Sequence, residues 1–115
     1  MHSTIYKLAP KAQWAEAEAR GQFTGAPIDH QDGYIHFSTA EQVEETAAKH
    51  FKGADDLLLI AVDPAKLGDL LKYEPSRGGA LFPHLYGPLP LSAVLSVEEL
   101  PLGEAGRHQF PEMNR

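Results

Sequence analysis

The chain has 115 residues, a length typical of one domain, and its 43% hydrophobic and 23% charged content excludes wholesale disorder. Because it contains no cysteine, disulfides, thiolate catalysis and cysteine-ligated zinc are excluded. The formal net charge of -6 disfavours a nucleic acid as partner, since an acidic surface repels phosphate backbones.

Targeting signals are not evident in the sequence. The first residues (MHSTI) lack a basic segment followed by a long apolar one, so we expect no secretion signal. The longest apolar run, Leu57–Val62, is too short to cross a membrane. We therefore expect a cytoplasmic protein without a membrane partner, and the oligomeric state stays open.

The first part of the chain predicts a strand, a helix and a loop. Ser3–Leu8 suits an opening strand. Lys11–Arg20 (KAQWAEAEAR) is rich in helix formers, and Gly21 is a suitable stop. Gln22–Gly33 has glycines, a proline and little periodicity, which predicts a loop, and long loops in small domains are often functional.

The next segment, DGYIHFST, predicts a strand with two different faces. Side chains alternate along a strand, so Ile35 and Phe37 share the core face, whereas Tyr34, His36 and Ser38 share the other. Three hydrogen-bonding groups on one face need a polar partner or solvent. They either line a site or meet water or a hydrogen-bonded loop.

A helix is expected after this strand. Ser38 and Glu41 fit a capping box, in which case the serine hydroxyl binds backbone and not a ligand. Val43 and Ala47 then recur at helical spacing, and Gly53 would end the helix.

The second half predicts two strands separated by irregular structure. Asp56–Asp63 is a continuous apolar run, typical of a central strand covered on both faces. Pro64–Leu71 suits a short helix or turn, Lys72–Leu91 is a loop rich in glycine and proline, and Ala93–Leu100 is the last strand. The polar tail 101–115 is expected to be loosely held.

This order of elements predicts a single α+β domain over residues 1–115, with its core at about 3–100. Two main helices would pack on a small, mostly antiparallel sheet.

Two further segments carry residues suited to chemistry. In EPSRGG, Arg77 before two glycines suits an anion clamp, while the alternative is a surface turn with an Arg77–Glu74 pair. In FPHLYG, an extended backbone would place His84 and Tyr86 on the same side of the strand. This repeats the pattern of His36 and Ser38, which share the polar face of the earlier strand. The two histidine segments could form one pocket, or Tyr86 could pack in a turn with His84 exposed.

Other chemistries find little support. None of the six histidines has the spacing of a metal motif, so no metal site is predicted. No Gly-x-Ser-x-Gly elbow of a serine hydrolase is present either.

Several blocks together resemble one family. They are Ile5-Tyr6, Trp14, DGYIHFST, His50-Phe51, DLLL, Glu74 and FPHLYG. This set, over about residues 4–100, resembles the DUF952 family of small proteins of unknown function, which is grouped by fold with the ADP-ribosyltransferases. The resemblance implies a split, curved, two-sheet core with a cleft for a nicotinamide dinucleotide.

The resemblance to those transferases assigns roles to further residues. Ser38 and Thr39 match the first two positions of their Ser-Thr-Ser, and Lys7 beside Tyr6 stands where an arginine or histidine is expected. The block around His36 resembles the histidine strand of RNA 2'-phosphotransferases. A catalytic glutamate is expected on a late strand, and neither Glu98 nor Glu99 can be assigned to it.

The sequence therefore predicts a polar cleft for a nucleotide-like or other anionic small molecule. Arg77 would hold a phosphate or carboxylate, His36 or His84 would orient or protonate it, and Glu74 would act as a base or position Arg77. Other ligand-binding candidates are Tyr6, Lys7, Tyr34, Ser38, Thr39 and Tyr86. The residues imply no cofactor, and the resemblance implies NAD or a related nucleotide. The alternative is a binding or regulatory module without catalysis.

Overall fold

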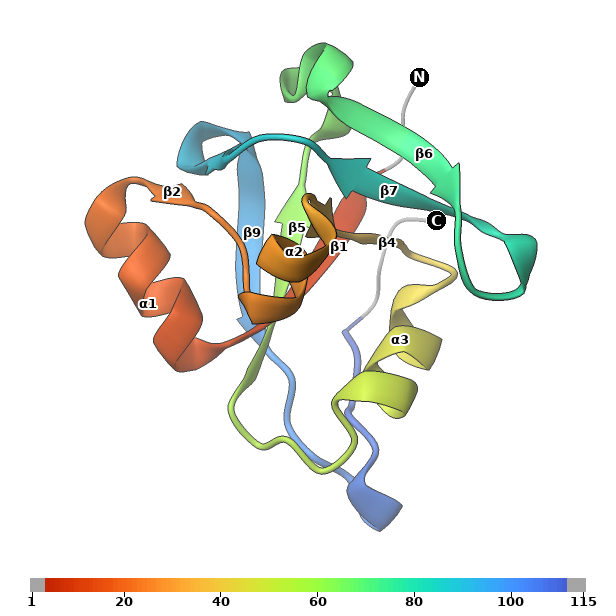
Figure 1. Cartoon of the computed structure of the whole chain (residues 1–115). Helices are drawn as coiled ribbons and strands as arrows, with labels where there is room; N and C mark the ends of the chain where they lie inside the picture. The colour runs from red at the N-terminus through yellow and green to blue at the C-terminus, as the bar shows by residue number, and fades with distance from the viewer. Residues whose placement is uncertain (1–3, 112–115) are drawn as a thin grey trace.

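The structure, a computed structural model, describes residues 4–111. That part of the chain forms an α+β domain (Figure 1). Its helices and strands are, in chain order, β1 (Ile5–Pro10), α1 (Lys11–Arg20), β2 (Gln22–Phe23), α2 (Pro27–Asp32), β3 (Ile35–His36), β4 (Ser38–Thr39), α3 (Val43–His50), β5 (Leu57–Val62), β6 (Leu71–Pro75), β7 (Leu81–Leu85), β8 (Leu89–Pro90) and β9 (Val94–Glu99). Short 3-10 turns connect several of them.

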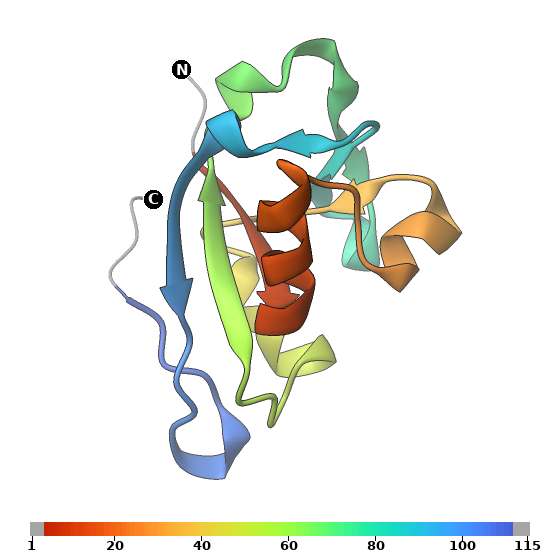
Figure 2. The same cartoon turned by 90° about the vertical axis from the view of Figure 1, so that its left-hand side faces the viewer.

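A four-stranded antiparallel sheet in the order β4-β1-β5-β9 forms the centre of the domain. All six residues of β5 are buried, as the apolar run predicts. Its alternate side chains Leu58, Ile60 and Val62 join one core, and Leu57, Leu59 and Ala61 join the other. Helices α1 and α3 cover the two opposite faces (Figures 1 and 2).

A second antiparallel sheet, in the order β3-β7-β6, lies across one end of the first (Figure 1). The chain passes between the two sheets at Phe37, whose backbone N–H donates to the carbonyl of Pro83 (2.9 Å). On one side of this crossing His36 pairs with His84, and on the other side Ser38 pairs with Tyr6. The segment read as one strand thus joins both sheets, and it brings the two histidine segments together.

Helix α1 has the bounds that the sequence predicts, but the region after it does not form a plain loop. Gly21, at φ 85°, caps α1. The predicted loop contains a third helix, α2, so the prediction of two main helices is wrong. Pro27 occupies its first turn and Gly33, at φ 88°, ends it, which is the usual proline-to-glycine asymmetry of helices. This signal was present in the sequence.

The predicted capping box is also wrong. Helix α3 begins at Val43 and ends at His50, so Ser38 is too far from it to cap. The Ser38 hydroxyl instead lies 3.0 Å from that of Thr46, and the Thr39 N–H donates to Gln42 Oε1 (3.1 Å). Ser38 is held by another side chain and not by the backbone at a helix terminus.

The segment predicted as a loop over residues 72–91 contains most of β6 and all of β7 and β8. Sequence patterning missed these strands because prolines and glycines interrupt the apolar pattern. Their partners lie elsewhere: β7 pairs with both β6 and β3, and β8 pairs with β2. Long-range pairing outweighs the weak local preference.

After β9 the chain stays in contact with the domain as far as it is described. Leu100 is buried, Phe110 packs against the core on the α3 side, and the His108 Nε2 lies 2.7 Å from the carbonyl oxygen of Ala54. The remainder of the tail, residues 112–115, lies outside the described part. Within residues 4–111 no helix is long and apolar enough to span a membrane.

The two-sided burial of β5 generates a stability prediction. Ile60 is fully buried at 0% exposure, and its neighbour Val97 on β9 is 40% exposed. Ile60→Ala should reduce the free energy of unfolding by about 2–5 kcal/mol, whereas Val97→Ala should change it by less than about 1 kcal/mol. Urea denaturation of both variants measures the difference, and equal losses would contradict the placement of the core.

Candidate functional site

A cavity of about 520 Å³ lies where the two sheets meet α2 and α3, and we call it the histidine cavity. Its apolar lining residues are Tyr6, Leu8, Ile28, Phe37, Phe51 and Phe82. Its polar lining residues are Lys7, Asp32, His36, Ser38, Thr46, His50, Ser76 and His84. Binding sites for small molecules usually combine such an apolar lining with a few polar groups in this range of volumes.

A buried carboxylate, Asp29 of α2, holds one side of this site together. It is 2% exposed and accepts hydrogen bonds from the ammonium of Lys7 at 3.0 and 3.3 Å. The backbone N–H groups of Ala26 (2.7 Å) and His36 (3.1 Å) donate to it as well. His36 Nδ1 lies 2.6 Å from the same carboxylate, so one side chain connects α2, β1 and β3.

The second nitrogen of His36 also faces a carboxylate, because Nε2 lies 2.9 Å from Asp32 Oδ2. Carboxylates only accept hydrogen bonds, so both contacts are hydrogen bonds when both ring nitrogens carry a proton, as in the imidazolium form. In that form the charges of Lys7 and His36 balance those of Asp29 and Asp32.

Burial and pairing act in opposite directions on the ionisable groups of this network. Burial alone would raise the pKa of Asp29, but the hydrogen bond with His36, the charge of Lys7 and the backbone donors together lower the pKa to about 2. Burial lowers the pKa of Lys7, and its interaction with Asp29 opposes that change. The anion is thus the stable form of Asp29 at neutral pH.

A second network lies behind the other histidine. His84 is 3% exposed, and its Nδ1 lies 2.8 Å from Glu74 Oε1 of β6. The hydroxyl of Tyr86 donates to the same oxygen at 2.7 Å. The ring of Tyr34 stacks on that of His84 with centroids 4.0 Å apart, and the rings of His84 and His36 are 5.7 Å apart.

These hydrogen bonds stabilise the ionised form of Glu74. The bonds from Tyr86 and then from His84 lower the pKa of Glu74. The same contact raises the pKa of Tyr86 to about 12. Burial, followed by the charges of Asp32 and Glu74, raises the pKa of Tyr34. Both tyrosines therefore remain neutral donors near neutral pH.

The structure brings most of the residues predicted for the site together. Tyr6, Lys7, His36, Ser38 and His84 line the histidine cavity. Tyr34 and Glu74 lie next to it, in contact with one or both of its paired histidines. Tyr86 contacts Glu74 and Tyr34 in turn. Their roles in binding or catalysis stay predictions.

Two predicted residues are placed less directly. Thr39 pairs with Ile5 between β4 and β1 and is not among the residues that line the cavity. The backbone of Arg77 lies in a 3-10 turn between β6 and β7, directly after Ser76, which does line it. The side chain of Arg77 lies outside what the structure describes, so the anion clamp stays a prediction.

Sequence reasoning missed Asp29 and Asp32. Both lie on α2, inside the segment predicted to be a loop, so no face or direction was assigned to them. The signals that bound this short helix, Pro27 and Gly33, could have placed Asp29 in its first turn. No sequence pattern could have shown that its partners are Lys7 and His36.

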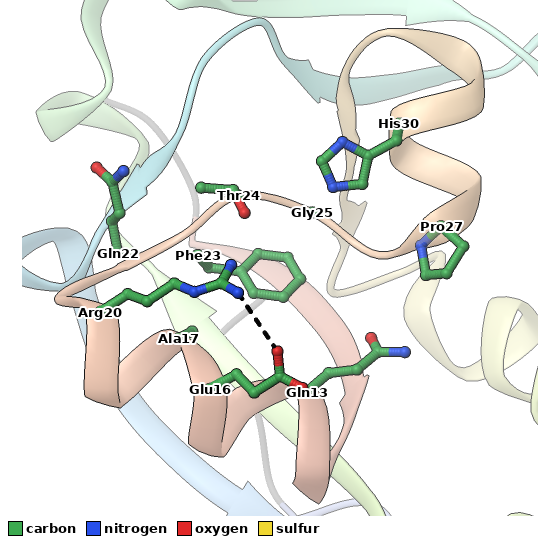
Figure 3. Close-up of a pocket in the computed structure, with 10 residues that line it drawn as sticks. All are labelled: Gln13, Glu16, Ala17, Arg20, Gln22, Phe23, Thr24, Gly25, Pro27 and His30. Atoms are coloured by element: carbon green, nitrogen blue, oxygen red, sulfur yellow. Dashed lines mark ion pairs between the residues drawn. The ribbon is translucent and has the colours of Figure 1, made fainter.

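A second hollow, of about 390 Å³, lies between α1, α2 and the segment that joins them (Figure 3). Its charged groups are Glu16 and Arg20, an exposed pair 3.7 Å apart on α1, with His30 across the opening. Exposed pairs of this kind contribute little energy. None of the predicted site residues lines it, and the buried ionisable groups lie at the histidine cavity instead.

The groupings typical of metal centres do not occur at either site. Within residues 4–111, no three histidine or acidic side chains are arranged to hold a metal ion.

These features define a small α+β protein with a cavity between two antiparallel sheets and paired histidines in its wall. The family model described as a protein of unknown function, DUF952, matches residues 8–97, and the chain belongs to this family. Tyr6 and Lys7 lie just before the matched range.

Solved structures of one relative are similar along nearly the whole chain. The crystal structure of protein CC0527 from Caulobacter crescentus is 48% identical in sequence, with a TM-score of 0.90. The matched region covers 93% of this chain and 94% of the CC0527 chain. The solution NMR structure of CC0527 has a TM-score of 0.85 at the same identity, and covers 94% of this chain and 93% of that chain. No curated protein matches the chain.

The Asp29 network generates a prediction about acid stability. The pKa of Asp29 is about 2 in the folded protein and 3.8 in a model peptide, so its anion stabilises the fold above pH 4. This contribution, about 2 kcal/mol, should be lost as the pH falls from 4 to 2. Denaturation with urea across this range measures the loss.

Asp29→Asn should flatten that part of the pH profile. At pH 7 the variant should lose about 3–5 kcal/mol, because the ammonium of Lys7 stays buried without its counter-ion. Asp32→Asn is the matched control: this carboxylate is partly exposed, so we expect a loss of about 1 kcal/mol or less. Similar losses in both variants would contradict the central role of Asp29.

Proposed function

We propose that the protein binds a small anionic, nucleotide-like molecule in the histidine cavity. The observation that carries this proposal is the lining of the cavity, which combines aromatic rings with hydroxyl, imidazole and ammonium groups. A nucleotide has two parts that suit these groups, a planar base and an acceptor-rich phosphate.

The polar lining favours a ligand with many acceptors. Ser38, Thr46 and Ser76 offer hydroxyl groups, and His84 offers an imidazole. Among the described residues that line the cavity, Asp32 is the only carboxylate, and His36 already pairs with it. An anionic group in the cavity therefore meets no unpaired carboxylate among the described lining residues.

The apolar lining suits a ring. Phe37 and Phe82 are buried at 3% and 8% exposure, and Tyr6 at 5%, so packing holds these rings in place. Contact between such rings and a nucleobase adds stacking energy to the burial of apolar surface. The cavity volume lies in the usual range for small-molecule sites.

The resemblance of the family to ADP-ribosyltransferases supports a more specific version, in which the ligand is NAD or a related nucleotide and the reaction is ADP-ribosyl or phosphoryl transfer. Two antiparallel sheets that meet at the site are compatible with the split core which that resemblance implies. Fold likeness alone does not establish an activity. The alternative, a non-catalytic binding or regulatory module, is favoured by the absence of a matched catalytic glutamate.

Binding can be tested by thermal shift and calorimetry with NAD, ADP-ribose, adenosine monophosphate and inorganic phosphate. A ligand present at 100 times its dissociation constant should stabilise the protein by about 2.7 kcal/mol. No stabilisation by any of the four would exclude the nucleotide proposal. Stabilisation by inorganic phosphate alone would reduce it to a simple anion site.

Four variants locate the ligand. Ser76→Trp places a bulky ring at an exposed position of the cavity wall, and it should weaken binding at least tenfold, whereas Ser92→Trp, exposed and away from the cavity, should not. Arg77→Ala should weaken binding if its guanidinium holds the anion. Arg20→Ala is its matched control at the second hollow, and weakening by that variant alone would move the ligand there.

A further inference from the structure

The two paired histidines of the cavity differ in the state of their ring nitrogens. In His36 both nitrogens are engaged, Nδ1 by Asp29 at 2.6 Å and Nε2 by Asp32 at 2.9 Å. An imidazole whose two nitrogens both donate has no lone pair left to accept a proton. Both ring nitrogens of His36 are therefore occupied within the protein.

His84 has one engaged nitrogen and one available nitrogen. Its Nδ1 lies 2.8 Å from Glu74, and the carboxylate can only accept, so Nδ1 carries the proton. Within residues 4–111 the Nε2 makes no hydrogen bond, and it is not among the buried polar atoms that lack a partner. Because the His84 side chain lines the histidine cavity, a ligand bound there lies beside the ring that carries this nitrogen.

The surroundings of His84 fix the ring in this state. Tyr86 donates to the same oxygen of Glu74 at 2.7 Å and holds the carboxylate in place. Tyr34 stacks on the imidazole at 4.0 Å and restricts its rotation. A histidine held by a carboxylate at one nitrogen, with the other directed to a ligand site, is the arrangement that general acid–base catalysis requires.

We propose that His84 is the proton acceptor and donor of the histidine cavity, that Glu74 is its positioning residue, and that the substrate class is a phosphoester or other ester cleaved by water or a hydroxyl group. This proposal rests on the proposed function for the class of ligand. It separates two histidines that the sequence left as equivalent candidates.

The proton balance of such a step is closed. Nε2 takes the proton of the attacking water or hydroxyl as its oxygen forms a bond to the electrophilic phosphorus or carbon. The imidazolium that results is stabilised by the carboxylate of Glu74, which keeps its hydrogen bond to Nδ1. As the bond to the leaving oxygen breaks, Nε2–H gives the proton to that oxygen, and His84 returns to its starting state.

The state of the His84 ring can be measured in the ligand-free protein. Nitrogen-15 NMR of the imidazoles at pH 7.5 should show a protonated Nδ1 and a bare Nε2 for His84. Glu74→Ala should increase the tautomer of His84 with the proton on Nε2, while Tyr86→Phe, which leaves the carboxylate, should retain the wild-type tautomer. A proton on Nε2 of His84 in the wild type would overturn the proposal.

Diethyl pyrocarbonate, which modifies unprotonated imidazole nitrogens, tests whether Nε2 of His84 is available to a molecule in the cavity. Peptide mass spectrometry of the folded protein should find His84 modified and His36 unmodified. Ser76→Trp should slow the reaction of His84 at least fivefold and leave that of the exposed His30 unchanged. No reaction at His84, or reaction at His36 instead, would contradict the proposal.

These experiments need no nucleotide, so their outcome is independent of the binding proposal. If adenosine monophosphate binds and also protects His84 from modification, the binding and proton-transfer proposals are both supported. If His84 has the expected tautomer and reactivity but no nucleotide stabilises the protein, the nucleotide proposal fails and the assignment of His84 remains. If a nucleotide binds without protecting His84, the histidine does not contact that ligand and its assignment as the proton-exchanging residue is overturned.

Discussion

The site depends on the buried carboxylate of Asp29. It neutralises the ammonium of Lys7 on β1, accepts the backbone N–H of His36 on β3 and caps the start of α2 through the N–H of Ala26. A buried charge of either sign is costly without a partner, so Lys7 and Asp29 must stay together. The consequence is geometric: Asp29 joins α2 to β1 of one sheet and to β3 of the other, beside the histidine cavity.

The crossing at Phe37 provides the second constraint. Within five residues the chain leaves one sheet and joins the other, so His36 pairs with His84 while Ser38 pairs with Tyr6. Two apolar residues, Ile35 and Phe37, anchor this segment at 3% exposure each. The polar residues His36 and Ser38, on either side of Phe37, therefore lie at the junction of the sheets, and the cavity there has lining residues from both. The two hydrophobic cores that flank β5 stabilise the domain, whereas the polar groups gather at the junction of the sheets.

The networks behind His36 and His84 use the same chemical groups for different ends. Two carboxylates engage both nitrogens of His36, whereas Glu74 engages one nitrogen of His84 and fixes its tautomer. The number of carboxylates around each ring thus decides whether a ring nitrogen stays available. The tyrosines near His84 add orientation without adding charge, since both remain protonated.

The sequence by itself determined the elements with strong local patterns. The bounds of α1, the buried strand β5 and the core positions Ile35 and Phe37 follow from helix propensity, a continuous apolar run and strand alternation. It also selected His36 and His84 as residues of one pocket. The tertiary structure alone placed Asp29 beside Lys7, 22 residues away in the chain, and assigned a different number of carboxylates to each histidine. Pairing of charges over such separations leaves no local pattern, because any acidic residue could serve until the fold brings one of them close.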